Sequence, residues 1–153
     1  MTALNRSYQG ASAAARMQGR RQKLLDVAFA AMCAEEWKNM SINQLCRQAE
    51  LNKRYFYESF ATLEDIAAAV IEDLSSKVIY IAFTSLAEGN QLKLPNLQLA
   101  QKVMRAVCEY LMDDPRRARV LFGEISENPV AKTNRRRIIN TLASVVSNYG
   151  HVH

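Results

Sequence analysis

The sequence predicts an all-α protein, and three observations support this. Apolar residues recur at three- and four-residue spacing in the long segments, which is the period of an amphipathic helix. The 153 residues include only 5 Gly and 3 Pro, which disfavours a β-sheet design with many turns. Residue types that cap helix N-termini stand directly before several of the apolar stripes. With 49% hydrophobic and 23% charged residues, the chain is ordinary for a globular protein with a hydrophobic core.

The N-terminal segment divides into an irregular part and a helix. Residues 1–18 lack apolar periodicity and are rich in Ala, Ser and Gly, so we expect a flexible basic arm there. A first helix is predicted over about Arg20–Ala34, because Leu24, Ala28 and Met32 fall on one face.

Two short helices are predicted next. Ser41 and Gln44 have the spacing of a capping box, in which each side chain satisfies a backbone donor of the other residue. The helix that they open is expected to stop near Glu50. A third helix, about Lys53–Phe60, follows after a turn of only three residues.

Four further helices complete the predicted fold. A long fourth helix covers Thr62–Ala87, with Thr62 as its cap, and a fifth covers Leu97–Met112. Asp114-Pro115 and Asn128-Pro129 each place Pro after a capping residue, so each predicts the start of a new helix. The seventh and last helix is expected to extend to Tyr149.

The net charge of +5 is concentrated near the N-terminus. Residues 1–60 contain nine Lys/Arg and five Asp/Glu, whereas residues 61–153 contain eleven and ten. No acidic residue precedes Asp26. A basic segment of this kind is typical of a chain that binds phosphate or another anionic surface, and a solvated tail is the alternative.

Composition also argues against several function classes. The cysteines, Cys33, Cys46 and Cys108, are odd in number and lack metal-ligand spacing, which favours a reducing cytoplasm. The only histidines, His151 and His153, stand at the C-terminus, so we expect no metal site, no cofactor and no His-dependent catalysis. With no Gly-rich phosphate loop either, we expect no enzyme. No apolar run approaches the roughly 18 residues of a membrane span, so no membrane partner is expected.

The order of the first three helices is typical of a helix-turn-helix DNA-binding unit. The third helix can turn Leu51, Phe56 and Phe60 toward a small core. Arg and Lys side chains can donate to guanine, and a Tyr hydroxyl can reach a phosphate or a base edge. The side chains left exposed at the N-terminal end of this helix are of these types: Lys53, Arg54, Tyr55 and Tyr57.

Several short motifs occur together between Arg20 and Leu74: Ala34-Glu35 after the basic first helix, Trp37, Ser41-Ile42 leading into Leu45-Cys46, the run Leu51–Phe60, and Glu64-Asp65-Ile66. With this set the segment resembles the DNA-binding domain of the TetR (tetracycline-repressor-like) family of transcriptional regulators. The run Leu51–Phe60 is similar to the turn and recognition helix of that family, which ends in Tyr-x-x-Phe.

The resemblance implies a domain organisation and a function. Residues 19–61 would form a three-helix DNA-binding domain, and a long fourth helix would join it to a helical region for effector binding and dimerisation within 62–153. The chain would be a transcriptional regulator, a ligand-responsive repressor acting as a homodimer on a palindromic operator in double-stranded DNA. The alternative is a helical protein-interaction module that keeps the helix-turn-helix shape without specific DNA binding.

The resemblance also implies roles for individual residues. Groove contacts would come from Lys53, Arg54 and Tyr55. Phosphate contacts would come from Ser41, Asn43, Tyr57 and Thr62, with Arg20 or Arg21 helping and Asn52 beside them at the start of the recognition helix. For a small-molecule effector the weak candidates are Met104, Cys108 and Phe122, for which core packing is the alternative.

The chain departs from the family pattern at several positions. The glycines usual after the first helix and in the turn are Glu36 and Glu50 here, so the backbone either avoids a positive φ or is strained. The Lys common near the start of the fourth helix is Leu63. Family members usually carry further C-terminal helices that pair two subunits, so this chain would be a fragment, a shortened member, or a protein that dimerises through its last helix.

Overall fold

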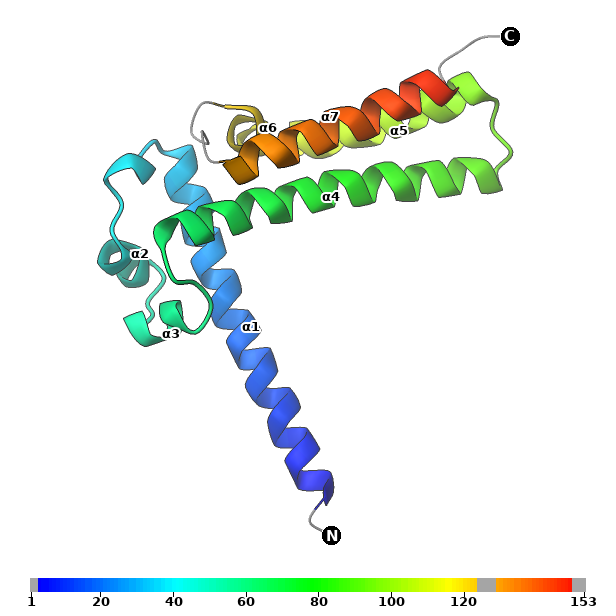
Figure 1. Ribbon diagram of the computed structural model, residues 1–153. Coiled ribbons are helices and arrows are strands. Elements are labelled where there is room, and N and C mark those ends of the chain that lie inside the picture. Colours follow the sequence, from blue (N-terminus) through cyan, green and yellow to red (C-terminus); the bar gives the residue numbers. More distant parts are fainter. Residues whose placement is uncertain (1–2, 124–128, 150–153) are drawn as a thin grey trace. The chain divides into compact units, whose positions relative to one another are not determined.

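A computed structural model describes residues 3–123 and 129–149, with side chains from residue 12 onward. The described residues form seven α-helices, one short 3₁₀ helix and no strand, which confirms the all-α class. In chain order the elements labelled in Figure 1 are α1 (Ala3–Cys33), the 3₁₀ helix η1 (Trp37–Asn39), α2 (Ile42–Gln48), α3 (Lys53–Tyr57), α4 (Leu63–Gln91), α5 (Asn96–Asp113), α6 (Pro115–Phe122) and α7 (Pro129–Tyr149).

The helices belong to two compact units, Met1–Val70 and Ile71–His153. The boundary falls inside α4, whereas the sequence predicted a domain boundary just before that helix. Each unit has its own apolar core, so each is described separately.

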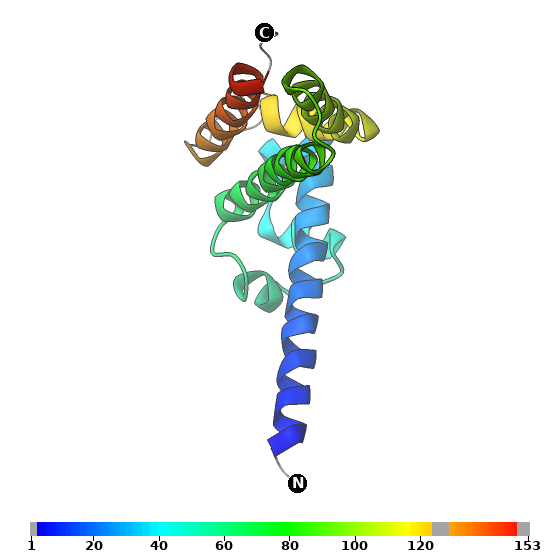
Figure 2. The same cartoon turned by 90° about the vertical axis from the view of Figure 1, so that its right-hand side faces the viewer.

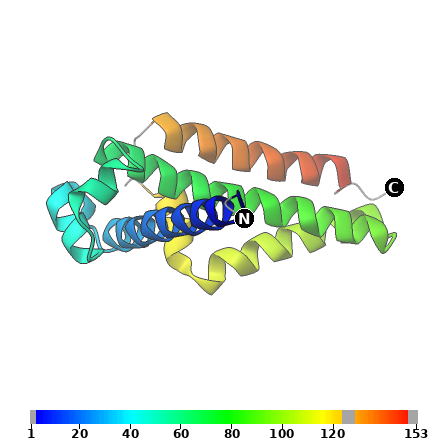
Figure 3. The same ribbon diagram turned by 90° about the horizontal axis from the view of Figure 1, so that it is seen from below.

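In the first unit, α1, α2 and α3 contact one another pairwise. Figure 3 shows α2 and α3 beside the C-terminal part of α1, with the N-terminal part of α1 extending beyond them. The stripe predicted for the first helix is buried, with Leu24 and Ala28 fully covered. The core of this unit is apolar and comprises Leu24, Leu25, Ala28, Ala31, Met32, Leu45, Cys46, Ala49, Phe56, Phe60, Ile66, Ala67 and Val70.

The sequence predicted a flexible arm over residues 1–18, but the described part of this stretch, residues 3–18, is helical. The structure continues α1 without a break from Ala3 to Cys33. This stretch has no apolar stripe, but it is rich in Ala and contains Arg16, Met17 and Gln18, all of which are good helix formers. A helix that is already nucleated adds such residues easily, so propensity extends α1 where periodicity gave no signal.

The third helix is shorter than predicted. Regular α3 ends at Tyr57 rather than near Phe60. The chain remains turned beyond this point, because the Phe60 N–H donates to the Phe56 carbonyl at 2.9 Å. Phe60 therefore still reaches the core, where it is 6% exposed.

In the second unit, α5 packs against both α6 and α7. Figure 2 looks roughly along these helices and shows α5 and α7 on two sides of the unit, with α4 as the third long helix. Glu72 on α4 is held by α7, since its Oε2 accepts from Asn134 Nδ2 at 2.6 Å and its Oε1 from Arg137 Nη2 at 3.2 Å. Asn134 is 3% exposed, so this link satisfies a buried amide.

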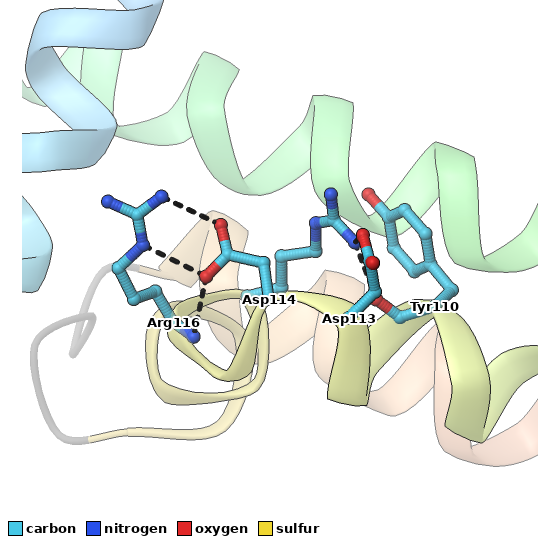
Figure 4. Close-up of polar contacts among 5 residues, drawn as sticks. Tyr110, Asp113, Asp114 and Arg116 are labelled. Atoms are coloured by element: carbon cyan, nitrogen blue, oxygen red, sulfur yellow. Dashed lines mark hydrogen bonds and ion pairs between the residues drawn. The ribbon is translucent and has the colours of Figure 1, made fainter.

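The corner between α5 and α6 confirms the Asp114-Pro115 helix start. The Asp114 side chain accepts from the Arg116 backbone N–H, and Pro115 occupies the first helical position. Figure 4 shows the Arg116 guanidinium facing the Asp114 carboxylate, with Nη2 at 2.8 Å and Nε at 2.9 Å. These hydrogen bonds from Arg116 hold the pKa of Asp114 below its ordinary value.

The end of α4 differs from the predicted one, whereas the start of α7 agrees with it. α4 continues to Gln91, past the Ala87 expected, and its Gly89 lies against the buried side chain of Leu99 on α5. α7 begins at Pro129 as expected, while the predicted cap Asn128 lies outside the described residues.

Candidate nucleic-acid interface

Helix α3 presents an apolar side to the core and a basic, aromatic side to solvent. Phe56 is fully buried, and its ring meets that of Tyr57 edge-on with centroids 5.4 Å apart. Tyr57 itself is 58% exposed, and the Arg54 side chain is 84% exposed. Lys53 is exposed as well. Three of the four side chains predicted at this end of the helix are therefore accessible together.

Tyr55, the fourth, is half-buried beneath an arginine of α1. The guanidinium carbon of Arg20 lies 4.3 Å from the centroid of the Tyr55 ring, a cation–π geometry. Arg20 Nη2 also donates to Glu58 Oε2 at 3.1 Å. Arg20, predicted to help hold phosphate, thus spans from α1 to the α3 region, and 27% of its side chain is exposed.

Arg21 makes a similar contact with Phe60, just beyond the end of α3. Its guanidinium carbon lies 5.2 Å from the centroid of the Phe60 ring, and the residue is half-buried. Both arginines therefore cover the α3 region from α1. Each still carries a positive charge that is partly open to solvent.

Three residues predicted to bind DNA serve as helix caps. The Ser41 hydroxyl oxygen accepts from the Gln44 N–H at 3.2 Å while Gln44 Oε1 accepts from the Ser41 N–H, so the capping box is confirmed. Asn52 Oδ1 accepts from the Arg54 N–H at 3.1 Å. Thr62 Oγ1 accepts from the Asp65 N–H at 3.1 Å.

Two of these three caps keep a spare donor, whereas the Ser41 hydroxyl donates its hydrogen to Gln44 Oε1 at 2.9 Å. The Asn52 cap uses only Oδ1, which leaves the Nδ2 group unneeded by the cap. The Thr62 hydroxyl accepts in the cap and keeps its hydrogen for another partner. Asn43, the remaining member of the predicted set, is exposed in the first turn of α2.

Glu58 is the residue of this region that sequence reasoning missed. It lies between two cations, with Oε2 on Arg20 and Oε1 at 3.8 Å from Arg54 Nε. The four-residue spacing of Arg54 and Glu58 was a signal available in the sequence. The contact with Arg20 was not, because it depends on how α1 packs against α3.

The effector candidates in the second unit stay a prediction. The structure has a groove of about 630 Å³ between α4 and α7, and Met104, Cys108 and Phe122 do not line it. Met104 is half-buried, Cys108 is exposed and Phe122 is 42% exposed. Most lining residues come from α7: Phe83, Leu86, Thr133, Arg136, Arg137, Asn140, Thr141, Ser144, Val145, Asn148 and Tyr149.

The described part of the chain also bears on other kinds of site. No cluster of three or more His, Cys, Asp or Glu side chains there could hold a metal ion. None of the helices described is both long and apolar enough to cross a membrane. Burial raises the pKa of the Cys46 thiol, an effect that nearby Lys53 partly opposes. Cys46 is thus a buried apolar group of the core rather than a reactive thiol.

The comparisons with known proteins bear on the fold. No protein-family model matches the chain, and no curated protein matches it in sequence. The fold is similar to that of a crystal structure described as a "putative tetR family transcription regulator" from Shewanella sp. PV-4, with a TM-score of 0.66. The match covers 84% of this chain and 69% of that one at 15% sequence identity. Likeness at this identity concerns architecture, and the chain therefore has a TetR-like all-α fold.

Proposed function

We propose that this chain is a sequence-specific DNA-binding transcriptional regulator, acting as a repressor and as a homodimer on a palindromic operator. The observation that supports the proposal most directly is the exposed group Lys53, Arg54 and Tyr57 on a short helix anchored by buried Phe56. A short helix with its outer face free is what the major groove admits, and Arg and Lys are donors to guanine.

The supporting residues suit phosphate binding around that helix. Ser41, Asn52 and Thr62 mark three helix N-termini, where backbone N–H groups and the helix dipole favour anions. The excess of nine Lys/Arg over five Asp/Glu in residues 1–60 gives this part of the chain a net charge of +4. Positive charge of this kind supplies the sequence-independent share of DNA affinity.

The homodimer follows from the size of one recognition helix. A single helix reads only a few base pairs, whereas operators bound by helix-turn-helix dimers have two half-sites about 34 Å apart. Two copies related by a two-fold axis would read an inverted repeat, because the symmetry of the protein is mirrored in the site.

We further propose a small-molecule effector bound in the groove between α4 and α7. Its volume of about 630 Å³ falls within the range of ligand pockets, roughly 300–1,000 Å³. α4 continues from the second compact unit into the first, so a ligand that binds differently to two positions of α4 would shift the population of DNA-competent dimers.

The experiment that tests the function is selection of random double-stranded DNA by the purified chain, followed by sequencing of the retained DNA. We expect an enriched inverted repeat, whose half-site spacing gives the separation of the two reading helices. A variant that carries Lys53→Ala and Arg54→Ala is the control, and it should lose the enrichment while remaining helical. No enrichment by a folded wild-type chain would favour the interaction-module alternative.

Salt dependence provides a second measurement on the same material. Binding that neutralises phosphates releases counterions, so log K should fall linearly with log salt concentration. Affinity that does not change with salt would contradict DNA binding and point to apolar association with another protein.

A further inference from the structure

Glu58 places a negative charge on the face of α3 that also carries the exposed cations. Its two carboxylate oxygens have different partners: Oε2 accepts from Arg20 Nη2 at 3.1 Å, and Oε1 lies 3.8 Å from Arg54 Nε. One oxygen thus faces the supporting helix α1, and the other faces the side chain expected to read DNA.

The two arginines are held to different degrees. Arg20 is 27% exposed at its side chain, is stacked on Tyr55 at 4.3 Å, and has a buried Nε. Arg54 is 84% exposed, and 3.8 Å is longer than a hydrogen bond. The carboxylate is therefore anchored through Arg20, and Arg54 is attracted to it without being fixed.

From this asymmetry we propose that Glu58 is a positioning residue that sets the DNA specificity of Arg54. This rests on the proposed DNA-binding function. The anchored carboxylate limits the conformations of Arg54 before binding, so less side-chain entropy is lost when Arg54 contacts a base. It also offsets the attraction of Arg54 to phosphates on any sequence, because a guanidinium that faces a carboxylate has less net charge to offer.

Glu58 should affect the binding of non-specific DNA and of the preferred site differently. Non-specific DNA offers Arg54 mainly the phosphate charge, which Glu58 opposes. The preferred site also offers a guanine edge with two acceptors in a fixed geometry, for which a pre-oriented guanidinium is favoured. Glu58 should therefore raise the ratio of specific to non-specific affinity while lowering non-specific affinity itself.

The test compares Glu58→Gln with Glu64→Gln, which makes the same charge change at an exposed residue in the first turn of α4. Dissociation constants are measured for the selected inverted repeat and for a scrambled duplex of equal length. We expect the specificity ratio to fall on the order of tenfold in Glu58→Gln, the share of one base contact, and to stay unchanged in Glu64→Gln. If both variants tighten both DNAs equally, Glu58 contributes only its charge and the proposal is wrong.

A second variant separates position from charge. Glu58→Asp keeps the charge but shortens the side chain, so it cannot reach Arg20 and Arg54 together. The proposal expects its specificity ratio to fall as well, whereas a charge effect alone predicts wild-type behaviour. Unchanged melting temperatures would show that the loss does not come from unfolding.

A third readout does not require DNA and so distinguishes failure of this inference from failure of the proposed function. In the free chain, the Arg20 Nε–H should exchange slowly with solvent in an NMR experiment, because this nitrogen is buried. Exchange should become fast in Glu58→Gln and stay slow in Glu64→Gln. If Arg20 remains protected in Glu58→Gln, Glu58 does not anchor this cluster, whether or not the wild-type chain selects DNA.

Discussion

Glu35, Glu50 and Lys93 have φ angles of 61°, 55° and 54°, in the left-handed region that favours glycine. Each follows a helix, and the next residue donates its N–H back five positions, as Leu51 does to the Cys46 carbonyl at 2.9 Å. This is the Schellman arrangement, which satisfies the last carbonyls of a helix. The sequence suggested a missing glycine at Glu36 and at Glu50. Glu50 has a positive φ and is therefore strained, as one of the two alternatives predicted. Glu36 has an ordinary φ of −79°, and the strained residue at that helix end is Glu35.

Glu50→Gly should stabilise the chain by about 1 kcal/mol. The change removes backbone strain of roughly 1–2 kcal/mol that a side chain causes in the left-handed region. It also removes an acidic side chain from the negative end of the α2 dipole. The entropic cost of introducing glycine is smaller than these two gains. Denaturant unfolding followed by circular dichroism measures the difference. Glu36→Gly is the matched control, and it should destabilise the chain because its φ is already ordinary. Stabilisation by both changes would contradict strain as the cause.

Arg54→Ala and Tyr57→Phe should have different effects on DNA binding. Loss of a base contact by Arg54 should cost about 1–3 kcal/mol on the preferred site and relax specificity there. Loss of the Tyr57 hydroxyl, to which the family resemblance assigns a phosphate contact, should weaken binding to all sequences alike. Binding of each variant to single-base-pair variants of the selected site separates the two cases. Equal, sequence-independent losses would show that base reading belongs to another residue.

At the scale of single elements, the helix starts follow from local side chains and the close contacts between helices do not. Thr62 and Asp65 cap α4 reciprocally, since Asp65 Oδ2 accepts from the Thr62 N–H at 2.9 Å. The contact between α4 and α5, in contrast, depends on the absence of a side chain at Gly89. A Cβ atom there would overlap Leu99 Cδ1, so the Leu99 side chain, which is buried at 1% exposure, would have to shift.

Gly89→Ala and Gly19→Ala should therefore change stability in opposite directions. Both glycines lie inside helices, where alanine is favoured by about 1 kcal/mol. A methyl group added at Gly19 would meet no atom within 4 Å, so Gly19→Ala should stabilise the chain by roughly that amount. Gly89→Ala should destabilise it by about 1–3 kcal/mol through overpacking against Leu99. Thermal unfolding of the two variants decides the matter, and equal shifts would mean that Gly89 and Leu99 are not in close contact.

At the scale of the whole molecule, the sequence predicted what depends on local information. The all-α class and the order of the helices come from periodicity and from caps such as Ser41 and Asp114, which act within a few residues. The contact between Arg20 and Glu58 joins residues 38 apart, and the groove between α4 and α7 depends on which faces meet. Neither leaves a pattern in one sequence, which is why the lining of the groove and Glu58 were missed.

The length of α1 has a consequence for how the chain opens locally. Residues 13–19 are exposed, whereas Leu24 and Met32 farther along the same helix are buried. A helix segment without packing has little stability of its own in water, because most helix stability in proteins comes from buried contacts. The free energy of local opening therefore rises along α1, from small at residues 13–19 to that of cooperative unfolding beside Leu24. We expect the exposed turns at residues 13–19 to open and re-form while the packed part of the same helix stays closed.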